Sequence, residues 1–188
     1  MDIADVASDL SQALYSDQQI QDRIAQLATQ IDADYADRAD QDLILVGVLN
    51  GAVMVMADLA RKLKTHCQME WMAISSYGSG TTSSGVLRPL KDLSVDVTGR
   101  HILVVEDIID TGLTLSYLVD NLRSRGPASV EVMTAFRKPE AIKCPVDVKY
   151  VGFDIPAQFV VGYGLDYAGR YRNLTGLGVL DPKVYAQG

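Results

Sequence analysis

Cysteine and histidine are scarce in this sequence, with 2 of each among 188 residues. Cys67 and Cys144 are too few and too far apart for a disulfide framework, and with two histidines they provide no cysteine-rich zinc site. We therefore expect two reduced thiols. Small proteins that are stabilised by a disulfide network or a zinc cluster are excluded as a class.

Basic residues are also few in this sequence. The 17 Lys and Arg residues are outnumbered by 24 Asp and Glu residues, which gives a net charge of -7. Proteins bind nucleic acids and anionic membranes through clustered basic side chains, and the only such group here is the short segment 61–64. The composition predicts that neither nucleic acid nor membrane is a partner.

The chain lacks long apolar runs and recognisable linkers. No uninterrupted apolar stretch approaches the ~20 residues that span a bilayer. Residues 1–10 carry three aspartates instead of a basic, apolar leader, so we expect a cytoplasmic protein. With 48% hydrophobic residues and no internal repeat, residues 1–188 are predicted to form a single domain.

The chain does contain alternating helix and strand patterns. Ser16 or Asp17 can cap a first helix, whose apolar residues recur at helical spacing: Ile20, Ile24, Leu27 and Ile31. Strand and helix patterns then follow in turn at 43–49, 51–64, 69–77, 103–106, 115–124 and 129–136. This order is typical of a doubly wound α/β fold, in which helices flank a mostly parallel sheet and ligands bind at the carboxyl ends of the strands.

The most informative segment is 101–114. Four apolar residues at 102–105 predict a strand that is buried on both faces of a parallel sheet. Glu106 and Asp107 follow at the carboxyl end of this strand. Because adjacent strand residues point to opposite faces, the two carboxylates are expected to serve different atoms of a ligand.

The loop after this strand contains Asp110, Thr111, Gly112, Leu113 and Thr114, and a helical pattern begins directly after it. Its glycine allows a ligand to approach the backbone, and a helix amino terminus offers free N–H donors to a phosphate. A phosphate beside three acids requires a hard cation such as Mg²⁺. A plain turn with a helix cap is the alternative for these residue types. Their combination at the end of a buried strand favours a phosphate site.

Residues 104–114, Val-Val-Glu-Asp-Ile-Ile-Asp-Thr-Gly-Leu-Thr, resemble the phosphoribosyl-pyrophosphate motif of type I phosphoribosyltransferases. The resemblance implies that Glu106 and Asp107 engage the ribose hydroxyls, directly or through metal, while residues 110–114 wrap the 5-phosphate. In the purine-specific branch of the family, the acid that opens the loop lies near the imidazole ring of the base. The resemblance therefore implies that Asp110 is the proton acceptor.

A glycine-containing turn follows the strand predicted at 43–49. Asn50 and Gly51 can form a plain tight turn or present backbone donors to an anion. The resemblance implies that this is the pyrophosphate loop, which often contains a non-proline cis peptide. Purine-specific members commonly carry Lys or Arg where this chain has Asn50, although an asparagine side chain can still donate a hydrogen bond.

Glycine and hydroxyl residues dominate the segment 75–85, a composition that is typical of a mobile hairpin. The resemblance implies that Ser76 and Tyr77 belong to a lid. Such a lid closes over the reacting ribose and excludes water, which would otherwise capture the developing cation.

The segment 149–167 resembles hypoxanthine-guanine phosphoribosyltransferases in particular. The resemblance implies that Phe159 stacks on the purine, that backbone groups near Val160 reach the purine edge, and that Lys138 donates to the 6-oxo group. It assigns Asp166 to the purine side and to a second Mg²⁺ site, and Arg172 to pyrophosphate. On the residue types alone, Phe159 would be a core residue and Lys138 a solvated one.

The implied metal ligands are therefore Glu106, Asp107 and Asp166, and the implied fold adds a small hood to the sheet. The implied reaction is purine salvage: hypoxanthine or guanine joins phosphoribosyl pyrophosphate in the presence of Mg²⁺, on a homodimer or homotetramer. Two alternatives stay open. One is a nucleic-acid-binding regulator on the same fold, which the net charge of -7 disfavours, and the other is a xanthine-preferring transferase.

Overall fold

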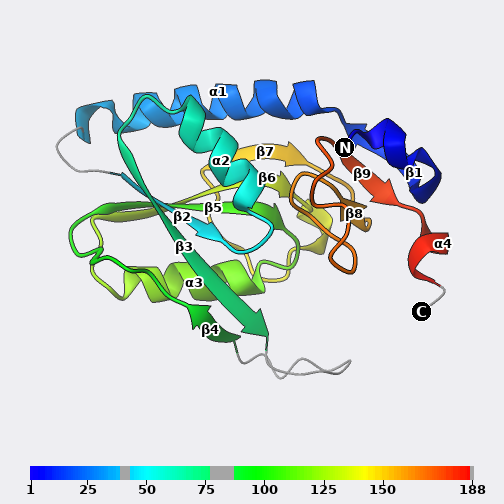
Figure 1. Ribbon diagram of the computed structural model, residues 1–188. Coiled ribbons are helices and arrows are strands. Elements are labelled where there is room, and N and C mark those ends of the chain that lie inside the picture. Colours follow the sequence, from blue (N-terminus) through cyan, green and yellow to red (C-terminus); the bar gives the residue numbers. More distant parts are fainter. Residues whose placement is uncertain (39–42, 77–86, 187–188) are drawn as a thin grey trace.

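The computed structural model describes residues 1–38, 43–76 and 87–186. Its centre is a six-stranded sheet in the order β4-β3-β2-β5-β6-β7 (Figure 1). All neighbouring pairs are parallel except β3 and β4, so the predicted mostly parallel sheet is confirmed. The strands are β2 (Leu43–Val48), β3 (Cys67–Ser76), β4 (Leu87–Lys91), β5 (His101–Ile109), β6 (Ser129–Arg137) and β7 (Tyr150–Asp154).

Helices cover both faces of this sheet, with α1 (Asp17–Tyr35) and α2 (Val53–Lys62) above it and α3 (Leu113–Arg123) below it in Figure 1. The alternation of side chains along the strands explains the two layers. In β2, Leu43 and Leu45 pack with α1 and α2, whereas Ile44 and Val46 pack with α3. The central strands are therefore buried on both faces, as their unbroken apolar runs predict.

The first helix begins where the sequence indicates. Ser16 is its N-cap and forms a capping box with Gln19. The apolar residues at helical spacing, Ile20, Ile24, Leu27 and Ile31, are all buried. The expected amphipathic helix that docks through one face is confirmed.

The expected end of the motif strand is wrong. The pattern places its last residue at Glu106, but β5 continues to Ile109 because Ile108 and Ile109 pair with β6. The acidic pair therefore lies within the last part of the strand and not at its end. The starts of two helices also differ by two residues from expectation: α2 begins at Val53, two residues later, and α3 begins at Leu113, two residues earlier.

A second, three-stranded sheet forms a hood from the two ends of the chain. Its strands are antiparallel in the order β1 (Leu10–Tyr15), β9 (Leu177–Leu180) and β8 (Val160–Val161). Short helical segments complete the structure: η1 (Ile3–Asp9), η2 (Ala36–Arg38), η3 (Pro139–Ala141) and α4 (Pro182–Tyr185). Figure 1 shows the hood beside the carboxyl ends of the central strands. No helix in the described ranges is long and apolar enough to cross a membrane.

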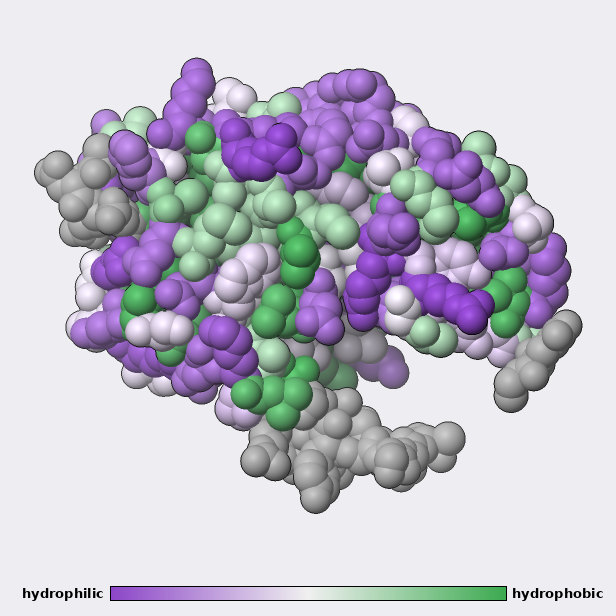
Figure 2. Space-filling model, in the orientation of Figure 1, coloured by the Kyte–Doolittle hydropathy of each residue, from purple (hydrophilic) through white to green (hydrophobic). Residues whose placement is uncertain are grey.

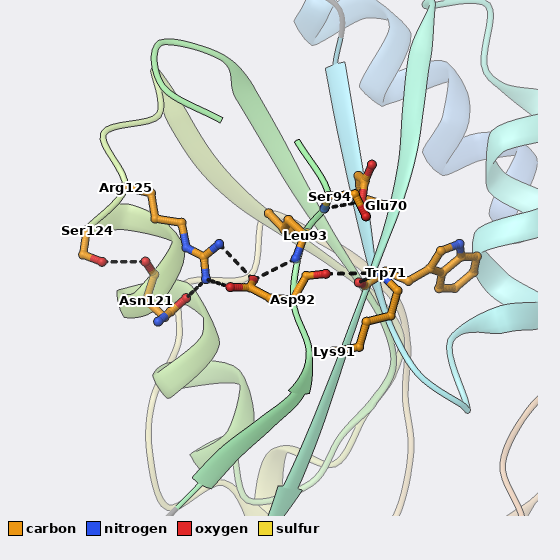
Figure 3. Close-up of polar contacts among 9 residues, drawn as sticks. All are labelled: Glu70, Trp71, Lys91, Asp92, Leu93, Ser94, Asn121, Ser124 and Arg125. Carbon is orange, nitrogen blue, oxygen red and sulfur yellow. Dashed lines mark hydrogen bonds and ion pairs between the residues drawn. The ribbon is translucent and has the colours of Figure 1, made fainter. Parts of the chain in front are cut away.

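Polar contacts fix the segment after β4 to its neighbours (Figure 3). The Arg125 guanidinium, at the end of α3, contacts both carboxylate oxygens of Asp92 at 2.9 and 3.0 Å and the Asn121 side chain at 2.7 Å. The Ser94 backbone N–H donates to Glu70 of β3 at 3.1 Å. These contacts hold the chain that follows the expected lid against β3 and α3.

The surface is mixed in character. Figure 2 shows hydrophilic residues along the α1 rim and a band of hydrophobic residues over α2 and across β3 and β4. The partly exposed large apolar side chains of these elements are Val53, Met54, Met69 and Leu90.

Candidate active site

The predicted phosphate loop, residues 110–114, connects β5 to α3. One glycine determines its shape. Gly112 is the N-cap of α3 and has a φ of 80°, in the left-handed region that disfavours other residues. A Cβ atom at this position would collide with the carbonyl oxygen of Cys144. The Thr111 carbonyl accepts hydrogen bonds from the Lys143 and Cys144 backbone N–H groups, each at 3.0 Å. The segment around Cys144 therefore supports the loop from behind.

A cavity of about 130 Å³ opens over this loop. It brings together the predicted residues Glu106, Asp110, Thr111, Gly112 and Thr114. Leu113 lies beside it as the first residue of α3 and is half-exposed. The N–H groups in the first turn of a helix have no carbonyl partner within the helix, so this cavity can accept an anionic phosphate.

Glu106 and Asp107 point into different cavities. Glu106 lines the phosphate-loop cavity, whereas Asp107 lines a second cavity of about 210 Å³. Burial, together with the charge of Asp107, raises the pKa of Glu106 well above its ordinary value. Burial likewise raises the pKa of Asp107. The expectation that the two acids serve different atoms agrees with this geometry.

The turn after β2 packs directly on Asp107. The Leu49–Asn50 peptide is cis, as the resemblance implies for this loop. A Cβ on Gly51 would collide with the Asp107 carboxylate, so the backbone of this turn closes one side of the acidic site. Asn50 is exposed. The turn therefore presents Asn50 at the surface above a buried carboxylate.

The second cavity collects the residues that the sequence assigns to the purine and to pyrophosphate. Its lining includes Asp107, Asp110, Lys138, Phe159, Val160, Asp166 and Arg172. Lys138 is only 8% exposed, and Phe159 is 44% exposed. A solvated lysine and a core phenylalanine, which the residue types alone suggest, are both wrong.

Two ion pairs organise this cavity. Lys138 Nζ lies 3.0 Å from Asp110 Oδ2. Arg172 pairs with Asp166 at 2.7 Å and donates to the Gly164 carbonyl at 2.7 Å. These contacts fix both cationic side chains in the cavity lining, where their N–H groups can donate to a polar or anionic ligand.

The donor set fits a hard, partly hydrated cation. Glu106, Asp107 and Asp166 offer carboxylate oxygens, but the described residues hold no cluster of three acidic, histidine or cysteine side chains that binds a metal alone. Mg²⁺ commonly takes only one or two protein carboxylates, with waters and substrate phosphates as its other ligands. The site therefore fits a metal that arrives with a phosphorylated substrate.

The lid residues are only partly described. Ser76 ends β3, while its side chain and Tyr77 lie outside the described residues. The sequence did not indicate a role for residues 143–144. They support the phosphate loop through backbone atoms, so their side chains give no signal of it.

A parallel sheet with a hood, an acidic strand and a helix-capping phosphate loop define a type I phosphoribosyltransferase. The family model described as "Phosphoribosyl transferase domain" matches residues 11–168, and the chain belongs to this family. The predicted fold class and the predicted enzyme class are both confirmed.

Curated relatives and a solved structure show to which members of this family the chain is similar. The hypoxanthine-guanine phosphoribosyltransferase of Mycobacterium bovis is 54% identical over 180 residues, covering 94% of this chain and 89% of the relative. The Bacillus subtilis protein of the same name is 46% identical, covering 94% of this chain and 97% of its own. A Trypanosoma cruzi hypoxanthine phosphoribosyltransferase mutant, solved as a ternary substrates complex, is 40% identical with a TM-score of 0.90, covering 95% of this chain and 99% of its own. The predicted resemblance is confirmed.

Proposed function

We propose that this enzyme transfers the 5-phosphoribosyl group of phosphoribosyl pyrophosphate to hypoxanthine or guanine, forming IMP or GMP and releasing pyrophosphate. One observation carries the proposal: the Lys138–Asp110 ion pair lies in the same cavity as the exposed ring of Phe159, next to the phosphate loop. The names of the relatives support the same substrates.

The purine occupies the second cavity. Its flat face stacks on Phe159, and backbone groups at Val160 meet its edge. Lys138 donates to the 6-oxo group, an acceptor that adenine lacks, so the lysine discriminates between the two kinds of purine. Asp110 then holds the proton that the ring nitrogen loses.

Phosphoribosyl pyrophosphate occupies the region between the two cavities. The N–H groups at the start of α3 bind its 5-phosphate, with Thr111 and Thr114 as hydroxyl donors. Glu106 and Asp107 bind the ribose hydroxyls and stabilise positive charge on the ribose as the bond to pyrophosphate breaks. Arg172, with backbone groups of Asn50 and Gly51, binds the leaving pyrophosphate.

The proposed metal is Mg²⁺, held by Glu106, Asp107 and Asp166. When bound, it neutralises pyrophosphate and favours its departure. Burial raises the pKa values of Glu106 and Asp107, and a bound cation would stabilise both carboxylates as anions, which supports this assignment. The lid that includes Ser76 and Tyr77 is proposed to exclude water during transfer.

We also propose the domain organisation, location, assembly state and partners of the enzyme. Residues 1–188 form one domain of a cytoplasmic homodimer or homotetramer that acts on small molecules and binds neither nucleic acid nor membrane. The net charge of -7 supports the last two points and disfavours a nucleic-acid-binding regulator. A xanthine-preferring transferase is the second alternative, and contacts at the purine 2-position decide between the bases.

The test is nucleotide formation from phosphoribosyl pyrophosphate and hypoxanthine, with Mg²⁺ or with excess EDTA. We expect IMP and pyrophosphate in equal amounts with Mg²⁺ and neither with EDTA. Binding of phosphoribosyl pyrophosphate without turnover of any base, combined with salt-sensitive RNA or DNA binding, would instead support the regulator.

A further inference from the structure

The Phe159 ring is exposed, yet the proposed function requires it to be held in one orientation. It is the aromatic side chain in the lining of the second cavity, and it is 44% exposed. An exposed side chain loses rotamer freedom when a ligand fixes it, and this loss weakens binding. A neighbour that already holds the ring removes part of this cost.

Two tyrosine rings contact Phe159. The Tyr185 ring centroid lies 5.5 Å from that of Phe159 with the planes tilted by 42°, and the Tyr167 centroid lies 6.0 Å away, edge to face. The two tyrosine rings also contact each other, with centroids 6.2 Å apart. The cavity lining in the described part of the chain contains Phe159 but neither tyrosine. Both tyrosines therefore pack on the ring without occupying the space for the base.

The backbone fixes Tyr185 relative to Phe159. The Leu180 N–H donates to the Phe159 carbonyl at 2.9 Å, and α4 begins two residues later, just beyond the end of β9 (Figure 1). Asp181 caps α4 by accepting from the Lys183 N–H at 3.0 Å, and the Asp181 N–H donates to the Asp9 carbonyl at 2.8 Å. The start of α4 is thus tied to Phe159, the residue that directly precedes β8.

We propose that Tyr185 is a positioning residue for the purine: its ring holds Phe159 in the orientation on which a flat base stacks. This inference rests on the proposed function. The contact between the two residues is between their rings, with centroids 5.5 Å apart. The effect should therefore appear in binding of the base, while binding of phosphoribosyl pyrophosphate and the chemical step are unaffected.

The first experiment compares steady-state kinetics of the full-length protein with those of Tyr185→Leu and Tyr185→Phe. Aromatic pairs contribute about 0.5–1.5 kcal/mol, so Tyr185→Leu should raise the KM for hypoxanthine by roughly three- to tenfold. The KM for phosphoribosyl pyrophosphate and kcat should not change, and Tyr185→Phe should match the unmodified enzyme. An unchanged hypoxanthine KM, or an equal rise in both KM values, overturns the proposal.

Lys183→Ala is the matched control on the same short helix. The Lys183 side chain is 60% exposed, and its ion pair in the described part of the chain is with Asp181. Lys183 is not among the residues that line the second cavity. This variant should keep the hypoxanthine KM of the unmodified enzyme. If it raises that KM as much as Tyr185→Leu does, the effect belongs to α4 as a whole and the proposal is overturned.

A double-mutant cycle on GMP binding tests whether Tyr185 acts through Phe159. Calorimetry gives the GMP Kd of the unmodified protein, Tyr185→Leu, Phe159→Leu and the double variant. We expect Tyr185→Leu to weaken GMP binding when Phe159 is present and to have no further effect in Phe159→Leu. An equal effect in both backgrounds overturns the proposal. Absence of catalysis in the unmodified protein would contradict the proposed function alone, since the cycle measures binding only.

Discussion

Lys138 and Asp110 form an ion pair across the second cavity, with Nζ and Oδ2 3.0 Å apart. Asp110 follows β5 and Lys138 follows β6, and the Lys138 N–H donates to the Ile109 carbonyl at 2.9 Å. The group proposed to recognise the 6-oxo position is thus already paired with the group proposed to accept the purine proton. On the proposed function, a base that binds here would meet both groups, so we expect its recognition and proton transfer to be coupled.

Asp110→Asn should separate proton transfer from substrate binding. The amide keeps the size of the side chain but accepts a proton poorly, so kcat should fall by about 10²–10⁴-fold. The KM for phosphoribosyl pyrophosphate should change little, because the phosphate-loop backbone binds that substrate. Steady-state kinetics with hypoxanthine measure both constants. Unchanged turnover would remove Asp110 from the chemistry.

Gly112→Ala should damage the phosphate loop. The new methyl group would collide with the Cys144 carbonyl and impose the left-handed backbone, which costs about 1–2 kcal/mol, on an alanine. We expect the KM for phosphoribosyl pyrophosphate to rise by about 10- to 100-fold, since misplaced contacts of this kind are costly.

Gly99→Ala provides the matched control for this substitution. Gly99 also has a positive φ, of 71°, but no atom of the described residues lies within 4 Å of a Cβ built there. It should show only the loss of stability that comes from the left-handed backbone, and an unchanged KM. Equal KM values for Gly112→Ala and Gly99→Ala would refute the role of the Cys144 contact.

Asn50→Lys should strengthen pyrophosphate binding. Asn50 is exposed at the turn that covers Asp107, where purine-specific members commonly carry a basic residue. A hydrogen bond to a charged group is worth roughly 1.5–3 kcal/mol, so the Kd for pyrophosphate with Mg²⁺ should fall about 10-fold or more. Asn50→Ala separates the effect of the added charge from that of the lost amide. Equal Kd values for Asn50→Lys and Asn50→Ala would show that this position does not reach pyrophosphate.

Asp34 should contribute to the acid sensitivity of folding, far from the active site. Hydrogen bonds from the Tyr150 hydroxyl at 2.7 Å and the Lys149 ammonium at 3.0 Å lower the pKa of Asp34 below its ordinary value. Its contribution to stability is therefore present above the unfolded pKa, near 3.8, and is lost as the pH falls through the lower folded pKa.

Thermal unfolding of the unmodified protein and of Asp34→Asn, followed from pH 7 to acid pH, measures this contribution. We expect the unmodified protein to have the higher Tm at pH 7 and the difference to shrink as the pH falls below the ordinary range of an aspartate. Because the side chain is partly exposed, the effect should be small. A difference in Tm that does not depend on pH would contradict the assignment.

The parts of the molecule that could be predicted from the sequence have local signals. The Ser16 cap of α1 lies about one turn before Ile20, the first residue of the apolar stripe. The motif from Glu106 to Thr114 is contiguous in the sequence. The chemistry of such a segment can be recognised from the sequence even when the residues that it contacts are unknown. The end of β5 was misplaced because pairing with β6, and not the local apolar pattern, extends it to Ile109.

The features without a local signal depend on residues that are distant in sequence. The hood, which only the family resemblance implies, pairs Leu10 with Leu180, and no local pattern indicates a partner at that separation. Cys144 supports Thr111 through backbone atoms only, so the type of residue at position 144 does not indicate this contact. The packing of Tyr185 on Phe159 likewise exists only because the hood brings the end of the chain back to β8.

The most direct test of the central claim is the base specificity of the enzyme. We would measure kcat/KM for hypoxanthine, guanine, xanthine and adenine in separate reactions with phosphoribosyl pyrophosphate and Mg²⁺, for the unmodified enzyme and for Lys138→Gln. The account predicts turnover of hypoxanthine and guanine without turnover of adenine, and a loss of about 10- to 100-fold with hypoxanthine when Lys138 is replaced. Adenine turnover comparable to that of hypoxanthine, or no effect of Lys138→Gln, would contradict it.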